Sequence, residues 1–323
     1  MEWEFPTLVD VYEARLRIAP HLRPTPLRHY PALDRAVGHG VRVLVKHENH
    51  QPIGAFKVRG GVNLVAQLSA DERERGVVTA STGNHGQSIA YAARLFGVRA
   101  VICVPEAANP VKTASIRGLG AELESHGRDF DDAREHAEQL ASEHGYRYVH
   151  SGNEPALIAG VGTEMLEIAE QEPRAEVVIV PIGGGSGAAG TCVVAKALDP
   201  SIRVIGVQSD AAPAALRSWR ERTLVEDRME TFAEGLATRT AFELPQQIMW
   251  ELLDDFEAVS DDEIRSAQAQ MIQTTRNLVE AAGAAPLALA LRLRDQLAGR
   301  RVVLVASGGN ASLEQLRDVL PPA

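Results

Sequence analysis

The sequence predicts an α/β fold with two parallel-sheet domains, the smaller inserted in the larger. Short apolar runs alternate with longer amphipathic stretches along the 323 residues, which is the pattern of repeated strand–helix–strand units. The alternation forms two sets, at about residues 76–150 and 177–306. A chain of this length also suits two domains. We therefore expect a small domain at residues 74–150 and a large domain formed by residues 1–73 and 151–323.

The strands and helices follow from these runs. Strands are expected at residues 41–45, 76–79, 100–104, 121–124, 146–148, 177–181, 204–207, 256–259 and 302–306. Helices are expected between most of them, including 86–96, 129–143, 160–170 and 261–280. Ser260 followed by three acidic residues marks the start of the last helix, because a serine oxygen caps free N–H groups and acids face the helix dipole. Parallel sheets carry ligand sites at the carboxyl ends of their strands, so we expect the functional site there.

Composition excludes several classes of partner. The formal net charge is −10 and basic residues form no cluster, so neither a nucleic acid nor an anionic membrane surface is an expected partner. No apolar run approaches the ~20 residues that span a bilayer. The acidic start MEWEFPTLVD lacks the pattern of a signal peptide, and we expect a soluble, cytoplasmic protein. Cys103 and Cys192 lie in apolar stretches and are expected in the core.

The first motif is a run of glycine and serine between the apolar run VVIVPI and a helical stretch; its members are Gly183, Gly184, Gly185, Ser186 and Gly187. Glycines let several backbone N–H groups face one anion, and the helix start behind them adds partial positive charge. The loop is therefore a candidate phosphate site, with a plain turn as the alternative. The run also fits G-x-G-x-x-G with an aspartate about twenty residues later, which would favour a nicotinamide-dependent oxidoreductase.

The second motif, STGNHGQ at residues 81–87, lies between another apolar run and a helical stretch. Hydroxyl, amide and backbone N–H donors come together there at a helix N-terminus. Such a set suits a small carboxylate, because side-chain donors fix a planar two-oxygen group. An ordinary helix cap without a ligand is the alternative.

The third motif, GAFKVRGG at residues 54–61, places Lys57 after Phe56 in a small and apolar stretch. Most lysines are solvated surface charges. Burial and a neighbouring helix N-terminus would instead lower the pKa of Lys57 from its ordinary value of ~10.4. A neutral amine is what Schiff-base chemistry requires. Arg59 is the poorer candidate, because a guanidinium stays charged.

The fourth motif, SGGN, begins at Ser307 directly after the apolar run VVLVA. A hydroxyl at a strand end can hydrogen-bond to the nitrogen of a heterocycle. A simple turn is the alternative, and for this motif alone it is the favoured interpretation.

Together and in this order, GAFKVRGG, STGNHGQ, GGGSG and SGGN resemble the fold-type II pyridoxal-phosphate enzymes, specifically the serine/threonine dehydratase and serine racemase group. The resemblance covers about residues 12–316. It implies a tryptophan synthase β-like fold, a pyridoxal 5'-phosphate cofactor, a small amino-acid substrate and a homodimer.

The resemblance also implies a role for each motif. Lys57 holds the cofactor as a Schiff base and removes the substrate α-proton, while Phe56 packs against the pyridine ring. The first motif binds the cofactor phosphate. Ser307 meets the pyridine nitrogen, Asn84 meets the ring hydroxyl, and Gly235 lies beside the ring edge. The residues expected around the substrate carboxylate are Ser81, Thr82, Asn84 and His85.

The implied reaction is a β-elimination, in which a β-hydroxy amino acid such as L-threonine or L-serine yields a 2-oxo acid and ammonia. A neutral Ser307, in place of an aspartate, is expected to favour prompt elimination. A dehydratase for a bulkier β-hydroxy amino acid, such as phenylserine or hydroxyaspartate, stays open. So does an amino-acid racemase, since Thr82 keeps the hydroxyl that racemases place opposite the lysine. The remote alternatives are a nicotinamide-dependent oxidoreductase and a non-catalytic ligand-binding protein.

The chain departs from the group's pattern at one expected cation site. Gln208 stands where several members hold a divalent cation with a glutamate, and a neutral amide replaces the charge that hard cations prefer. No metal is therefore expected. The chain ends soon after the SGGN motif, so no regulatory domain is expected either. Trp219 and Phe242 are candidates for the pocket around the substrate's β-side chain, with plain packing as the favoured interpretation.

Overall fold

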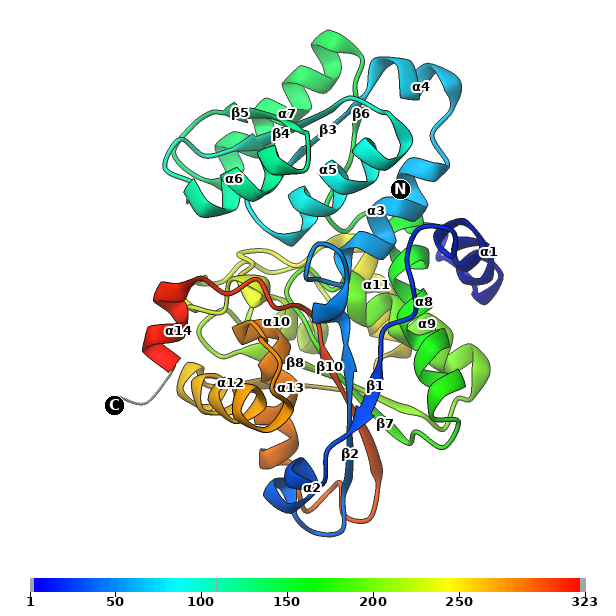
Figure 1. The fold of residues 1–323 in the computed structure, drawn as a ribbon, viewed down its shortest axis with the longest axis vertical. Coiled ribbons are helices and arrows are strands. Elements are labelled where there is room, and N and C mark those ends of the chain that lie inside the picture. Colours follow the sequence, from blue (N-terminus) through cyan, green and yellow to red (C-terminus); the bar gives the residue numbers. More distant parts are fainter. Residues whose placement is uncertain (1–2, 109, 320–323) are drawn as a thin grey trace.

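The computed structural model describes residues 3–108 and 110–319, which form two sheets flanked by helices (Figure 1). The larger sheet has the strand order β1-β2-β10-β7-β8-β9, and the smaller has the order β5-β4-β3-β6. Neighbouring strands are parallel except for β1, which pairs with β2 in the antiparallel sense. The predicted α/β class with two parallel sheets is confirmed. Every strand of the smaller sheet lies within residues 74–150, and the domain boundaries themselves stay a prediction.

The elements have the following bounds. The strands of the larger sheet are β1 Leu27–His29, β2 Arg42–His47, β7 Val177–Pro181, β8 Arg203–Ser209, β9 Asp255–Val259 and β10 Arg301–Ala306. Those of the smaller sheet are β3 Val77–Ala80, β4 Ala100–Val104, β5 Glu122–Ser125 and β6 Arg147–Tyr148. The helices are α1 Leu8–Ile18, α2 Pro31–Val37, α3 Lys57–Ala66, α4 Ala70–Arg75, α5 Asn84–Phe96, α6 Pro110–Gly118, α7 Phe130–His144, α8 Pro155–Gln171, α9 Ser186–Leu198, α10 Ala214–Glu221, α11 Glu243–Leu252, α12 Asp261–Thr275, α13 Ala281–Arg292 and α14 Leu313–Val319, with the short 3-10 helices η1 Glu48–His50 and η2 Glu234–Leu236.

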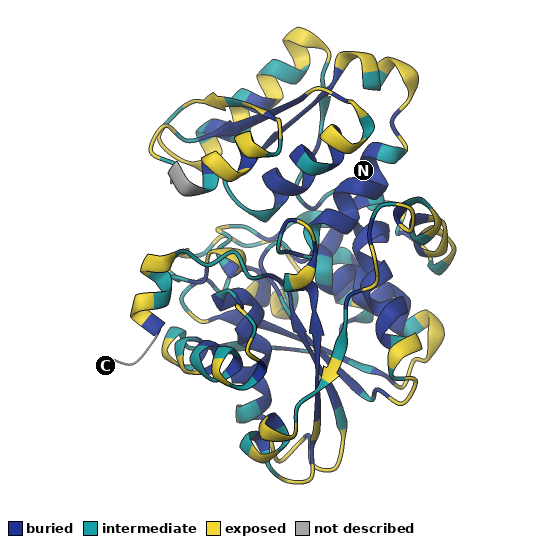
Figure 2. Cartoon of the chain, viewed as in Figure 1, coloured by how far each residue is buried: buried dark blue, intermediate teal, exposed yellow. Residues whose placement is uncertain are grey.

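All nine predicted strands are present, with ends that shift by at most two residues. Strand β1 was not predicted, because three residues are too few to carry an alternating pattern. The strand side chains alternate between two layers of helices. Val303 and Val305 of β10 pack with α1, α3, α8, α9 and α11, whereas Val302 and Leu304 pack with α2, α12 and α13. Figure 2 shows the inner strands of both sheets as buried, whereas the edge strands β1 and β5 and the outer helices carry exposed residues.

The prediction of one helix over residues 261–280 was wrong, because the chain turns out of the helix at Arg276. Arg276 has a φ of 60°, in the left-handed region, and ends α12. Side chains then satisfy the helix end: Oγ of Thr275 accepts from the N–H of Asn277 at 3.2 Å, and Nδ2 of Asn277 donates to the oxygen of Thr275 at 2.6 Å. A new helix, α13, begins after Glu280. The predicted cap at Ser260 is present as a capping box.

The strand order explains why distant motifs meet. Strands β2, β10 and β7 are adjacent and parallel, so their carboxyl ends lie side by side. GAFKVRGG follows β2, SGGN follows β10 and GGGSG follows β7. STGNHGQ follows β3 of the smaller sheet, and α3 lies between the two sheets (Figure 1). In the described part of the chain, the helices are too short or too polar for any of them to cross a membrane.

Candidate functional site

Lys57 is the first residue of α3, and its amino group lies between two loops. Nζ donates to the backbone oxygen of Ser151 at 3.1 Å and to Oγ of Ser186 at 2.8 Å. The sequence has three other lysines, each ion-paired with a carboxylate: Lys46, Lys112 and Lys196. Lys57 forms no ion pair with any residue in the described ranges, and desolvation lowers its pKa to about 8. Of the four lysines, Lys57 is therefore the one suited to act as a neutral amine.

The segment before Lys57 is fixed to the SGGN motif by backbone contacts. The N–H of Phe56 donates to the oxygen of Ser307 at 3.0 Å, and the N–H of Gly309 donates to the oxygen of Gly54 at 2.8 Å. Gly54 has a φ of 69°, a left-handed conformation that favours glycine. The buried Ser307 thereby lies beside the start of α3, as expected for a residue that shares a ligand with Lys57.

The loop at residues 183–187 connects β7 to α9 and lies against other segments so closely that only glycine fits. A Cβ on Gly183 would lie 2.3 Å from the backbone oxygen of Gly235, and one on Gly184 would lie 2.1 Å from the ring of Phe242. Gly185 has a φ of 89°. The first N–H groups of α9 have no acceptor within the helix, and the helix dipole is positive at this end. The loop therefore offers an anion a set of backbone donors.

The ring of Phe56 lies beside the same loop. A Cβ on Gly187 would lie 3.1 Å from the Phe56 ring, and Nζ of Lys57 lies 5.5 Å from the centroid of that ring. The aromatic face, the amine and the anion-binding loop thus border one region. Gly235 adjoins this region through its contact with Gly183.

The STGNHGQ loop brings Ser81 and Thr82, both half-buried, to the start of α5. His85 faces away from the loop. Oγ1 of Thr79 donates its one hydrogen to the oxygen of Val149 at 2.7 Å, so at 3.0 Å from Nε2 of His85 it accepts, and Nε2 carries the proton. Burial lowers the pKa of His85 to about 3 and keeps the ring neutral. A carboxylate would therefore be met by the loop hydroxyls and the N–H groups at the start of α5.

Three further residues at this site were not predicted with a role. The carbonyl of Ser151 receives the Lys57 amine, and no motif marks it in the sequence. Nδ1 of His150 accepts from the N–H groups of Gly152 and Asn153 at 3.1 and 2.9 Å, and burial lowers the pKa of His150 to about 4. Glu280 lies at the start of α13, and its carboxylate accepts from Nδ2 of Asn84 at 3.0 Å. The helix predicted over residues 261–280 contained Glu280, whereas the structure has it just before α13.

Phe242 and Trp219, the two aromatic candidates for a side-chain pocket, lie in different places. The ring of Phe242 packs edge-on against His150, with centroids 4.9 Å apart, and contacts the glycine loop at Gly184. Trp219 packs against Phe256 with centroids 6.2 Å apart, and its indole N–H donates to the backbone oxygen of Met249. Plain packing thus accounts for Trp219, whereas Phe242 borders the site.

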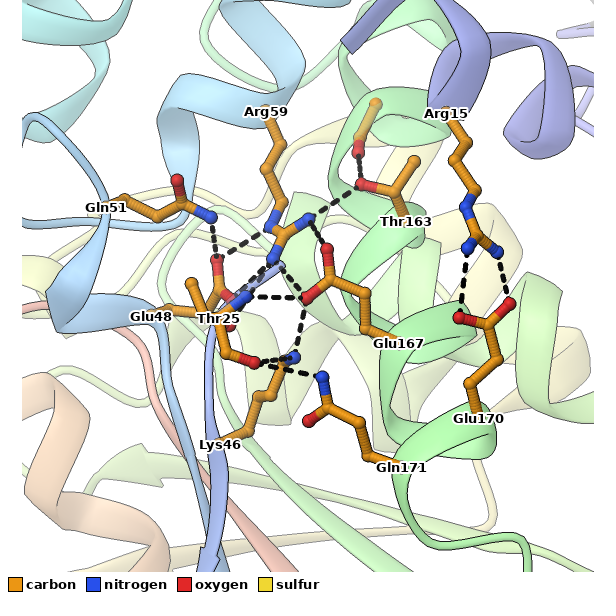
Figure 3. A network of polar contacts seen from close by, with 11 residues as sticks. Arg15, Thr25, Lys46, Glu48, Gln51, Arg59, Thr163, Glu167, Glu170 and Gln171 are labelled. Atoms are coloured by element: carbon orange, nitrogen blue, oxygen red, sulfur yellow. Dashed lines mark hydrogen bonds and ion pairs between the residues drawn. The ribbon is translucent and has the colours of Figure 1, made fainter. Parts of the chain in front are cut away.

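A buried charged cluster surrounds Arg59; its members are Lys46, Glu48, Arg59, Glu164 and Glu167. Figure 3 shows four of them, Lys46, Glu48, Arg59 and Glu167. Arg59 forms ion pairs with Glu48 and Glu167, both at 2.7 Å, and Nζ of Lys46 donates to Glu167 at 2.6 Å. The adjacent guanidinium holds the pKa of Glu48 below its ordinary value. Burial raises the pKa of Glu164 well above its ordinary value, which favours the neutral acid. The cluster then has balanced charge, and it ties the first turn of α3 to β2, η1 and α8.

These features fit the cofactor that the resemblance implies. A desolvated amine without an acid partner suits attachment to an aldehyde. An anion site of glycines and a helix start suits a phosphate, and the ring of Phe56 lies near both the loop and the amine. The backbone bond from Phe56 to Ser307 brings a residue with a neutral hydroxyl beside the start of α3.

Comparison with known proteins gives one consistent result. Residues 18–308 match the family described as pyridoxal-phosphate dependent enzyme. An L-threonine ammonia-lyase of Thermotoga maritima is 36% identical over 315 residues, which is 97% of this chain and 78% of that protein. A catabolic L-threonine dehydratase of Staphylococcus aureus is 36% identical over 318 residues, 97% of this chain and 92% of that protein. Among solved structures, maize serine racemase has a TM-score of 0.93 at 30% identity, over 98% of this chain and 97% of that one.

Proposed function

The chain belongs to the family of pyridoxal-phosphate-dependent enzymes, and from that premise we propose that it is an ammonia-lyase. It converts a β-hydroxy amino acid into a 2-oxo acid and ammonia, since the water lost in the elimination is returned by hydrolysis, and L-threonine or L-serine is the preferred substrate. The observation that carries the proposal is Lys57, the one lysine without an ion pair among the described residues, with a pKa lowered to about 8. Two similar proteins are named as threonine ammonia-lyase and threonine dehydratase, which supports this substrate class.

When bound, the cofactor supplies an aldehyde for the lysine amine and draws electrons from the substrate Cα. Lys57 is the proposed base that takes the α-proton. A general base works best when its pKa lies near the operating pH. The neighbouring imidazoles have pKa values of about 3 for His85 and about 4 for His150, so Lys57 is the better matched group.

The remaining residues bind and orient. The loop at residues 183–187 and the start of α9 would hold the phosphate, and Phe56 and Gly235, which both adjoin this loop, would pack against the ring. Ser307 donates to or accepts from the pyridine nitrogen without adding charge. Ser81, Thr82 and the N–H groups at the start of α5 bind the substrate carboxylate, and Asn84 meets the ring oxygen. Phe242 packs beside the glycine loop at Gly184.

Attachment of the cofactor to Lys57 is tested first. The purified protein mixed with pyridoxal 5'-phosphate is expected to gain a visible absorbance band that borohydride bleaches. With only four lysines in the chain, peptide mapping after reduction identifies the attachment site without ambiguity. Lys57→Ala should lose the band and at least about 10²-fold of the activity, whereas Lys196→Ala, at a lysine paired with Asp254, should keep both. Cofactor found on another lysine would refute the assignment.

Release of ammonia and 2-oxo acid over a panel of amino acids tests the reaction. L-threonine and L-serine are expected to react faster than phenylserine or hydroxyaspartate. Interconversion of L- and D-serine without ammonia release would favour the racemase instead, to which Thr82 and the likeness to maize serine racemase point. We also propose that the chain forms a homodimer, as the resemblance implies, and light scattering tests this.

A further inference from the structure

The side-chain amide of Asn84 is bonded at both of its polar atoms. Oδ1 accepts from Nδ2 of Asn310 at 2.7 Å, and Nδ2 donates to Oε1 of Glu280 at 3.0 Å. Asn84 follows β3 of the smaller sheet, whereas Glu280 directly precedes α13 and Asn310 follows β10 of the larger sheet. One amide therefore joins three segments that are far apart along the chain.

A backbone carbonyl sets the direction of these hydrogen bonds. Nδ2 of Asn310 also donates to the backbone oxygen of Ile53 at 2.8 Å. A carbonyl can only accept, so the amino end of Asn310 must face both Ile53 and Asn84. Asn84 must then turn its oxygen to Asn310 and its amino group to Glu280. The reversed orientation of the Asn84 amide would place two donors face to face.

Close packing holds the two partners of Asn84 in place. A Cβ on Gly54 would lie 2.9 Å from Oδ1 of Asn310, and a Cβ on Gly308 would lie 2.4 Å from Oε1 of Glu280. The N–H of Glu280 donates to the oxygen of Gly308 at 2.9 Å, which ties the start of α13 to the SGGN motif. Glycines at both positions thus leave room for this arrangement.

The amino group of Asn84 keeps one hydrogen to offer. An amide nitrogen carries two hydrogens, and the first is directed to Glu280. No described residue is recorded as an acceptor for the second. Glu280 can accept whether or not it is ionised, because a protonated carboxyl keeps an acceptor oxygen. Burial raises the pKa of Glu280, while Lys112, the other charged group beside it, lowers it.

We propose that Glu280 and Asn310 are positioning residues that hold Asn84 as a hydrogen-bond donor toward the ring oxygen of the cofactor. This inference rests on the proposed function, in which Asn84 meets that oxygen. A deprotonated ring oxygen accepts such a bond, and a charged acceptor strengthens it. A ring hydroxyl that kept its proton could still accept this bond, but it could not donate to Asn84, whose oxygen faces Asn310. The arrangement therefore favours the deprotonated ring oxygen, because a charged acceptor makes the stronger bond.

Binding of pyridoxal 5'-phosphate to the cofactor-free protein tests the inference without measuring turnover. The dissociation constant and the absorbance spectrum of the bound cofactor are compared across the pH range in which the protein stays folded. Glu280→Ala is expected to bind about tenfold more weakly and to show more of the band of the protonated ring. Glu280→Gln keeps an acceptor oxygen, so its affinity and spectrum should stay within about twofold of the original protein.

Glu234→Ala is the matched control, since Glu234 pairs with Lys112 nearby but does not touch Asn84. Asn310→Ala removes the other partner and should shift the spectrum in the same direction, which covers the case in which Glu280→Ala does not fold. An unchanged spectrum in the folded alanine variants would overturn the inference, and so would equal losses in Glu280→Ala and Glu280→Gln. Protein that takes up no cofactor would refute both proposals, whereas bound cofactor without ammonia release would refute the lyase alone.

Discussion

Lys57 and Arg59 lie two residues apart on α3, yet their side chains enter different environments. Arg59 enters the charged cluster, where two carboxylates pair with it at 2.7 Å. The amine of Lys57 meets a carbonyl and a hydroxyl instead. The two carboxylates raise the pKa of Arg59 above its ordinary value, whereas desolvation lowers the pKa of Lys57 to about 8.

The contrast teaches that burial alone does not make an amine reactive. Lys46 is fully buried, but it donates to Glu167 and therefore keeps a partner for its charge. Lys57 is only partly buried as a whole residue, and its amino group has no carboxylate partner among the described residues. A buried lysine beside a carboxylate is held in its charged form and stabilises the fold. A buried lysine beside a carbonyl and a hydroxyl can lose its proton and react.

Removing Arg59 is expected to have the largest effect on stability. Arg59→Met leaves Glu48 and Glu167 buried without their guanidinium, and breaking a buried pair in this way costs about 3–5 kcal/mol of unfolding free energy. Urea unfolding of the cofactor-free protein measures the loss. Arg15→Met, at an exposed arginine shown in the same view, is the control (Figure 3). A loss no larger than that of the control would mean that the charged cluster does not stabilise the start of α3.

A carboxylate placed beside Lys57 would remove the difference between its environment and that of Arg59. Ser186→Asp places a carboxylate where Oγ now accepts from Nζ at 2.8 Å, and it should raise the pKa of Lys57 by at least about one unit. The rate of acylation of Lys57 in the cofactor-free protein, followed by mass spectrometry against pH, reports the midpoint. Ser186→Ala should leave the midpoint near that of the original protein. An unchanged midpoint in Ser186→Asp would show that neighbouring charge does not control this amine.

The lowered pKa of Lys57 also predicts a dependence of stability on pH. Between about pH 8 and its ordinary pKa of 10.5, Lys57 binds a proton in the unfolded chain but not in the folded one. Stability rises with pH wherever the unfolded state binds more protons. The penalty from Lys57 is thus fully present below pH 8 and is relieved as pH rises through this window. The unfolding free energy of the original protein, measured relative to that of Lys57→Met, should increase between about pH 8 and pH 10.5. A difference that stays constant over this range would contradict the lowered pKa of Lys57.

Local patterns predicted one half of the site well. Lys57, the glycine loop and Ser307 each follow a strand, and the parallel order of β2, β10 and β7 brings such strand ends together. This reasoning needs only the alternation of apolar runs and short motifs. The pairing of these residues with a cofactor remains a proposal.

The other half depends on contacts that no local pattern reports. The partners of Arg59 lie 11 and 108 positions away, so its role in the charged cluster could not be read beside Lys57. Glu280 was assigned to a continuous helix, because the amphipathic pattern runs through the turn at Arg276. That turn depends on the left-handed backbone of Arg276 and on the side chains of Thr275 and Asn277.

The smallest expected effect comes from Glu170, which lies three residues after Glu167 on α8 and pairs with Arg15 at the surface (Figure 3). The side chains of Arg15 and Glu170 are 38% and 54% exposed, so water screens their attraction and Glu170→Gln should cost less than about 1 kcal/mol. Glu167→Gln makes the same chemical change where it leaves Lys46 and Arg59 short of a carboxylate, and it should cost several times more. Urea unfolding at low and high salt measures both. The Glu170 effect should vanish in high salt while the Glu167 effect persists, because salt screens exposed pairs far more than buried ones. Equal losses would mean that the location of a carboxylate, inside or outside the cluster, does not determine its contribution.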